Sequence, residues 1–221
     1  MQIAIGLYDG FTALDAIGPY QVFTLVPGVD VKLCAAEAGR VVDDNKLLRL
    51  DVEHTFAELT EPDIVVVPGG VITRRMAAEG HPVIDWVRGA HPTTTWTTSV
   101  CTGAVLLGAA GVLEGLRATT HWYAYDQIEK LGATATEERV VIEGKVVTGA
   151  GVSAGVDMAL TLVGRIYGPE VAQAIQLGIE YDPQPPYDAG APSKAAEPIR
   201  ELVSMSLAAS EAALAQGPSP S

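Results

Sequence analysis

Short apolar runs rich in β-branched residues alternate along this chain with stretches that have the periodicity of an amphipathic helix. The alternation predicts an α/β fold with a mostly parallel sheet sandwiched by helices, because parallel strands need helical crossovers between them. Strands are expected at Ile3–Leu7, Val31–Ala35, Ile64–Val67, Thr94–Val100 and Ala118–Thr120, with a hairpin of Val140–Ile142 and Val146–Thr148. Helices are expected at Asp15–Leu25 (broken early by Gly18-Pro19), Pro82–Ala90, Ala104–Ala110, Tyr123–Leu131, Ala154–Ile166 and Pro169–Gly178.

The C-terminal part of the chain has a different character, and we divide the sequence into an α/β domain at 1–190 and a C-terminal arm and helix at 191–221. Residues Tyr181–Gly190 are proline-rich and predict an extended segment. The helix expected at Pro198–Ala215 carries four large apolar residues, and Gln216–Ser221 is expected to be frayed. We expect the arm and helix to pack on the domain or on a dimer partner. The four apolar residues are Leu202, Met205, Leu207 and Leu214.

Composition excludes several classes of protein. The 221 residues suit one domain, and the net charge of −13 argues against a nucleic-acid partner and against an anionic membrane surface. Two cysteines suggest no disulfide framework, and no cluster of residues has metal-ligand spacing. The sequence has neither a signal-peptide pattern nor an apolar run long enough to span a membrane. We therefore expect a soluble, cytoplasmic protein without a bound metal.

One segment, Thr97–Leu107, predicts a reactive site. A β-branched run stops at Cys101, and small residues and then an apolar helical pattern follow it. This is the layout of a nucleophile elbow, which exposes a side chain at the N-terminus of a helix. There the helix dipole and free N–H groups favour a thiolate. The alternative is that Cys101 is a small, buried apolar residue.

Several other chemistry-bearing residues follow predicted strands, where ligands bind in open α/β sheets. Asp15 could transfer a proton or hydrogen-bond the thiolate of Cys101. The backbone N–H groups of Gly70 and Thr102 could stabilise developing negative charge as an oxyanion hole. Alternatively, Asp15 is a helix N-cap and Gly69-Gly70 is only a tight turn.

His121 is the natural candidate for a partner of the cysteine, because it follows a predicted strand and lies beside Trp122. The residue directly after Cys101 is a threonine, however, not a histidine. The glycine-rich run Gly149–Gly155 lacks the Lys-Ser/Thr ending of a phosphate-binding loop. We interpret that run as a site of close packing between the following helix and the pocket.

Three motifs in order resemble the ThiJ/PfpI superfamily, within the class I glutamine amidotransferase-like (flavodoxin-like) fold: Val66–Gly70, Ser99–Gly103 and Ala118–Trp122. The similarity runs from Met1 to about Gly190. Within the superfamily, Leu107–Trp122 and Glu180–Tyr187 resemble the isocyanide (isonitrile) hydratases. The resemblance implies a homodimer, a nucleophilic cysteine, a small-molecule substrate and no cofactor.

By motif match, the resemblance places the nucleophile at Cys101, the acid at Asp15 and the oxyanion contacts at the amides of Gly70 and Thr102. It implies a hydro-lyase that converts an isocyanide and water to an N-formamide through a thioimidate on the cysteine. Threonine at 102 departs from the histidine of PfpI-type proteases and amidotransferases, which weakens a protease or amidase interpretation. AraC-type regulators share these motifs in their sensor halves, but we expect this chain to lack their DNA-binding region.

Two other functions remain open at the level of the sequence. One is a glyoxalase-like thiol enzyme that acts on small carbonyl compounds. The other is a non-enzymatic redox or ligand sensor, because an activated thiol at Cys101 is also easily oxidised to a sulfinic acid. Whether His121 takes part is undecided in each case.

Overall fold

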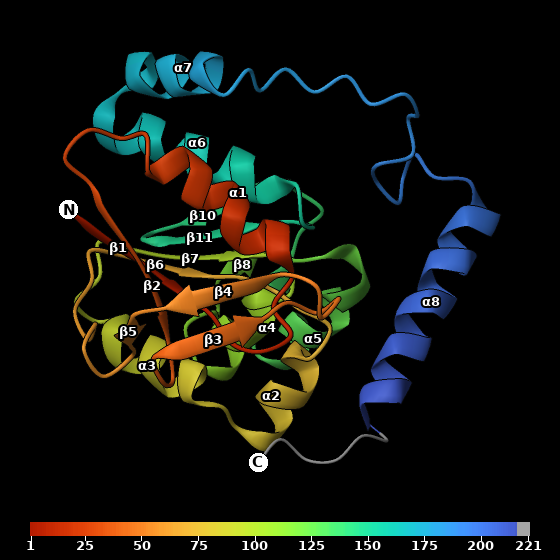
Figure 1. Ribbon diagram of the computed structural model, residues 1–221. Coiled ribbons are helices and arrows are strands. Elements are labelled where there is room, and N and C mark those ends of the chain that lie inside the picture. The colour runs from red at the N-terminus through yellow and green to blue at the C-terminus, as the bar shows by residue number, and fades with distance from the viewer. Residues whose placement is uncertain (216–221) are drawn as a thin grey trace. The chain divides into compact units, whose positions relative to one another are not determined.

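A seven-stranded sheet forms the centre of the computed structural model, which describes residues 1–215 (Figure 1). Its strand order is β10-β11-β7-β6-β1-β2-β5, and only the pairing of β10 with β11 is antiparallel. The chain therefore has the predicted α/β fold. The sheet strands are β1 (Gln2–Gly6), β2 (Asp30–Ala35), β5 (His54–Thr55), β6 (Ile64–Val67), β7 (Trp96–Val100), β10 (Val140–Glu143) and β11 (Val146–Gly149).

Helices cover both faces of the sheet, with α1 and α6 on one face and α3, α4 and α5 on the other (Figure 1). Because both faces are covered, the central strands β1, β6, β7 and β11 are almost entirely buried, and all four residues of β6 are both apolar and buried. The helices are α1 (Ala13–Phe23), α2 (Thr73–Glu79), α3 (Pro82–Ala90), α4 (Gly103–Ala109), α5 (Tyr125–Lys130), α6 (Ala154–Tyr167), α7 (Pro169–Gly178) and α8 (Glu197–Ala215), with a 3-10 turn at Trp122–Ala124.

Helix α1 corrects one prediction, because it runs through the expected break at Gly18-Pro19. Tight packing against α6 holds the helix together across the proline. A Cβ on Gly18 would lie 3.2 Å from Val156 Cγ2, and a Cβ on Gly155 would lie 3.2 Å from Pro19 Cδ. Tertiary contacts therefore override a local signal that usually ends a helix.

The segment between β2 and α3 contains most of the elements that the sequence did not predict. It holds the hairpin β3 (Gly39–Val42) and β4 (Arg49–Val52), the edge strand β5, and helix α2. The hairpin lies outside the main sheet, and its apolar residues are interrupted by Arg40, Arg49 and Asp51, so it lacks the apolar run of a strand such as β6. A second small ladder joins β8 (Arg117–Ala118) to β9 (Thr134–Ala135).

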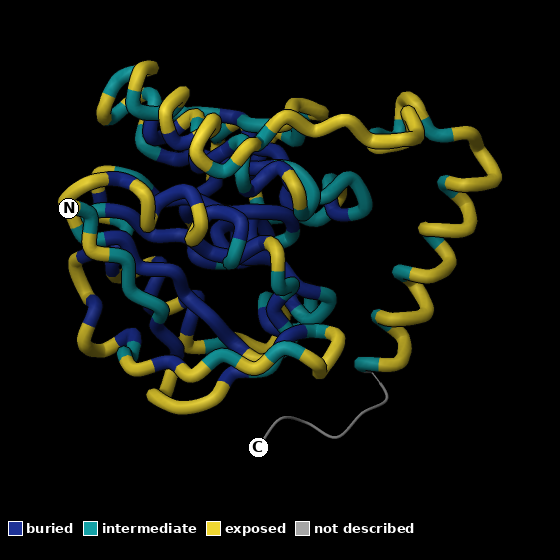
Figure 2. The backbone as a smooth tube through the Cα atoms, turned by 45° about the horizontal axis from the view of Figure 1, so that its top comes forward, coloured by how far each residue is buried: buried dark blue, intermediate teal, exposed yellow. Residues whose placement is uncertain are grey.

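The chain divides into two units, Met1–Ile179 and Glu180–Ser221, so the division falls before the expected border at residue 190. In the second unit, the segment before α8 is mostly exposed (Figure 2). Ile199, Leu202 and Met205 of α8 are exposed apolar residues. The prediction of a frayed end at 216–221 lies outside the described residues. None of the helices within residues 1–215 combines the length and apolarity needed to cross a membrane.

Candidate active site

The turn between β7 and α4 holds Cys101 in a strained backbone conformation. Its φ angle is +57°, which a non-glycine residue adopts only at a cost. The backbone N–H of Cys101 donates to the carbonyls of Gly149 (3.0 Å) and Ala150 (2.8 Å). The hydroxyl of Thr120 donates to the Cys101 carbonyl at 2.8 Å. The strand–turn–helix layout predicted around this cysteine is thus confirmed, and hydrogen bonds to both its N–H and its carbonyl fix the turn.

Close packing explains the small residue after the turn. A Cβ on Gly103 would lie 2.1 Å from the carbonyl oxygen of Val67, far inside van der Waals contact. Helix α4 therefore begins directly against the end of β6. This contact places the turn of Cys101 beside the Pro68–Gly70 segment.

Asp15 lies in the first turn of α1 and is completely buried. Gly69 donates its N–H to Asp15 Oδ2 at 2.8 Å. Among the described residues, Oδ1 has no hydrogen-bond partner, and the thiol of Cys101 lies close enough to the carboxyl group for each to shift the pKa of the other. The N-cap of the helix is Thr12, so the interpretation of Asp15 as the cap is wrong.

Burial dominates the protonation of both groups. It raises the pKa of Asp15 to about 7, although the hydrogen bonds from Gly69 and Cys101 oppose the shift. Burial also raises the pKa of the Cys101 thiol, and the negative charge of Asp15 adds to that effect. The net direction is therefore opposite to the one expected from the helix dipole and free N–H groups, although the N–H groups of Thr102 and Val152 do lower the pKa of Cys101. Helix α4 has only seven residues, and desolvation outweighs its favourable field.

Thr102 and Gly70 form a reciprocal pair next to the cysteine. The Gly70 N–H donates to Thr102 Oγ1 at 3.0 Å. The Thr102 hydroxyl in turn donates to the Gly70 carbonyl, also at 3.0 Å. The Gly70 amide, which we expected in the oxyanion hole, thus already has a partner and must exchange it to bind an anion. A Cβ on Gly69 would lie 2.6 Å from Thr102 N and 2.8 Å from Asp15 Oδ2, so only glycine fits there.

Val152 and Tyr8, which the sequence did not single out, also lie at the cysteine. The backbone N–H groups of Val152 and of Thr102 both interact with the sulfur and lower the pKa of Cys101. Val152 has a φ of +22°, an unusual value for a β-branched residue. The only signal in the sequence is that this valine lies in the middle of the glycine-rich run Gly149–Gly155.

Tyr8 is the other unpredicted neighbour. Its hydroxyl donates to the Pro68 carbonyl at 2.7 Å, and its side chain is buried. Burial, and then the charges of Asp15 and Cys101, raise the pKa of Tyr8 well above its ordinary value. The tyrosine therefore remains neutral and closes one side of the site.

His121 lies beside Gly151 of the glycine-rich run. A Cβ on Gly151 would lie 2.9 Å from His121 Cδ2. The Nδ1 atom of His121 accepts the Tyr123 N–H at 3.4 Å, and burial followed by the charge of Arg74 lowers its pKa. Among the described contacts, His121 has no hydrogen bond to Cys101 or Asp15. Within residues 1–215, no group of three or more His, Cys, Asp or Glu side chains is placed to hold a metal ion.

These features define a class: an α/β protein with a cysteine on a strained strand-to-helix turn and a buried carboxyl group beside it. The model of the DJ-1/PfpI family matches residues 1–165. The chain belongs to the DJ-1/PfpI family, as the three sequence motifs predicted.

Individual relatives agree with this assignment. The chain is 40% identical over 195 residues to isonitrile hydratase from Pseudomonas putida, covering 88% of this chain and 85% of that protein. A crystal structure of a ThiJ/PfpI family protein from Pseudomonas syringae has a TM-score of 0.88 and 34% identity, with 96% of this chain and 89% of that chain covered. Drosophila melanogaster DJ-1beta shares the fold, with a TM-score of 0.73 at 20% identity over 81% of this chain and 97% of that chain.

The family also includes proteins of other kinds. The HTH-type transcriptional regulator CdhR from Pseudomonas aeruginosa is 29% identical over 140 residues, which are 62% of this chain but 41% of the regulator. Family membership alone therefore does not define the reaction.

Proposed function

We propose that this protein hydrates isonitriles to N-substituted formamides, with Cys101 as the nucleophile and Asp15 as the proton carrier. The observation that carries the proposal is the buried pair itself: a thiol on a strained turn beside a buried carboxyl group whose pKa burial raises to about 7. Such a group can both give and take a proton near neutral pH. The 40% identity to isonitrile hydratase from Pseudomonas putida supports the choice of substrate.

In the first step, the sulfur of Cys101 attacks the terminal carbon of the isonitrile and forms a C–S bond. The thiol proton passes to the Asp15 carboxylate, and the resulting carboxylic acid protonates the same carbon. The net change is addition of S–H across that carbon, which gives a thioimidate, R–N=CH–S–Cys101. Asp15 returns to the carboxylate, so charge and protons balance.

In the second step, water adds to the thioimidate carbon. The Asp15 carboxylate takes one proton from the water as the water oxygen bonds to the carbon, and the second water proton passes to the nitrogen. The tetrahedral intermediate then expels the sulfur, and Asp15 returns a proton to it. The products are R–NH–CHO and the free thiol, so one water is consumed per isonitrile. The N–H groups of Thr102 and Val152 stabilise the sulfur as it leaves.

The environment suits an uncharged substrate. An isonitrile carries no net charge and enters a buried site without the desolvation penalty of an ion. Peptide and amide hydrolysis needs a group that protonates a departing amine, a task that histidine performs beside many cysteines. In this chain Thr102 follows the cysteine, and His121 is not hydrogen-bonded to it, so the geometry favours hydration.

The test is turnover of a simple alkyl isonitrile, followed by NMR as the N-formyl signal appears. In D₂O the formyl carbon should acquire deuterium, because its proton comes from the exchangeable Asp15 carboxyl group. Cys101→Ala should give no product while its circular dichroism spectrum stays that of the wild type. Absence of formamide with the wild-type protein, or product formation by Cys101→Ala, would refute the proposal.

A further inference from the structure

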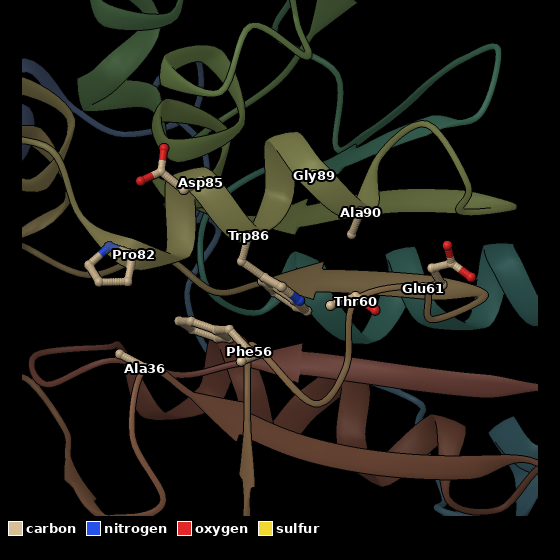
Figure 3. Close-up of a pocket in the computed structure, with 10 residues that line it drawn as sticks. Ala36, Phe56, Thr60, Glu61, Pro82, Asp85, Trp86, Gly89 and Ala90 are labelled. Atoms are coloured by element: carbon tan, nitrogen blue, oxygen red, sulfur yellow. The ribbon is translucent and has the colours of Figure 1, made fainter.

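A second hollow lies on helix α3, apart from the cysteine site. It has a volume of about 470 Å³, within the range of sites for small molecules. The exposed side of α3 forms one wall, and the segment after β5 forms the other (Figure 3). None of its lining residues is among those that contact Cys101 or Asp15. The proposed hydration reaction makes no use of this groove.

Two aromatic rings form the floor of the groove. Phe56 and Trp86 stack with their centroids 4.8 Å apart and their planes 15° from parallel. The indole N–H of Trp86 donates to the Leu59 carbonyl at 2.7 Å, which ties α3 to the opposite wall. Both rings are largely buried, so the floor is already formed without a ligand. A preformed apolar surface of this kind lowers the entropic cost of binding.

The space above this floor exists because the walls carry small residues. Ala57, Gly89 and Ala90 line it, together with Pro82 at the start of the helix. A Cβ on Gly89 would meet no atom within 4 Å, so this glycine leaves open space rather than permitting a close contact. The groove therefore admits a flat ring system without any movement of the backbone.

The charge around the groove is negative. Glu61 lies at one end, beside Ala90, and is exposed (Figure 3). Asp85 is the other charged lining residue, and it is paired with Arg88. No lysine or arginine lines the groove, and the chain as a whole carries a net charge of −13. An anionic ligand is disfavoured here, whereas a cationic group gains from Glu61 and from the overall field.

From these observations we infer that the α3 groove binds a small organic cation: a flat apolar ring system that bears an ammonium group. The rings would lie on the Phe56–Trp86 floor, and the ammonium group would lie at the Glu61 end. This is a second binding site of the molecule, and it stands whether or not the protein hydrates isonitriles.

The test uses three matched probes on the full chain: 1-naphthylmethylamine, 1-naphthylmethanol and 1-naphthylacetate. Calorimetry should give saturable binding in the order amine, alcohol, acetate. In an NMR titration the indole N–H signal of Trp86, identified among the three tryptophans by its loss in Trp86→Phe, should shift with the amine. No saturable binding of any probe, or a preference for the acetate, would overturn the inference.

Variants separate the groove from the rest of the surface. Gly89→Leu fills the space and should weaken binding of the amine at least tenfold, while Gly178→Leu, at another open glycine at the end of α7, should leave it unchanged. Glu61→Gln should weaken the amine about threefold, as expected for an exposed charge pair, and leave the alcohol unaffected. Glu129→Gln, at an exposed position of α5, is its control. Equal effects of Gly89→Leu and Gly178→Leu, or unchanged affinity in Gly89→Leu, would refute the site.

Discussion

Replacing Asp15 with asparagine measures how strongly burial of this carboxyl group destabilises the folded protein at high pH. The folded-state pKa is about 7, whereas an aspartate in an unfolded chain titrates near ~3.9. Between these values the folded state binds more protons than the unfolded state. The free energy of unfolding therefore falls as the pH rises through this window, and the loss is complete only above the folded-state pKa.

The size of the effect follows from the two pKa values. From pH 5 to pH 8, ionisation of Asp15 lowers the free energy of unfolding of the wild type by about 2–3 kcal/mol. Asparagine stays neutral, and its side-chain oxygen can still accept the Gly69 N–H. The stability of Asp15→Asn relative to the wild type should therefore increase by about the same 2–3 kcal/mol over this range.

The assay is urea unfolding at pH 5, 6, 7 and 8, with the difference between variant and wild type taken at each pH. Asp126→Asn is the matched control, because Lys130 lowers the pKa of Asp126 and keeps it ionised throughout this range. Turnover of an isonitrile should fall by roughly 10²–10⁴-fold in Asp15→Asn at every pH. A stability difference that does not vary with pH would refute the reasoning about burial.

Three further predictions concern the site and the C-terminal helix. Cys101→Ala should abolish turnover of an isonitrile, whereas Cys34→Ser, at a buried position of β2, should keep it. The reverse result would show that Cys101 is not the nucleophile. Gly69→Ala should lower the free energy of unfolding by about 1–3 kcal/mol, because the added Cβ would collide with the Thr102 amide. A urea titration that gives the same free energy of unfolding as the wild type would show that the backbone moves apart to accept the methyl group. We also expect a homodimer that uses α8, so changing both Leu202 and Met205 to glutamate should shift the mass in light scattering from dimer to monomer; a monomeric wild type at micromolar concentration would contradict this.

The sequence predicted the parts of the site that depend on local pattern. The β-branched run before Cys101 and the small residues after it define a strand, a turn and a helix by themselves. The placement of Asp15 near the cysteine followed from the rule that parallel strands end at one edge of the sheet.

The features of the site that the sequence did not predict depend on tertiary contacts. Val152 meets the sulfur through its backbone N–H, which any residue could supply, so its side chain carries no signal. Tyr8 faces the site because β1 ends beside Pro68. The pKa of Cys101 depends on how deeply the turn is buried. The pattern of residue types in the sequence does not predict the depth of burial.

The strained turn has a consequence for how this chain can change over evolutionary time. Glycine adopts a φ of +57° freely, whereas cysteine at position 101 pays about 1–2 kcal/mol for it. Cys101→Gly should therefore melt at a higher temperature than Cys101→Ala, even though both lack the thiol. A duplicated copy released from selection on its chemistry would gain stability by replacing Cys101 with glycine. The cysteine thus persists only while its reactivity is under selection.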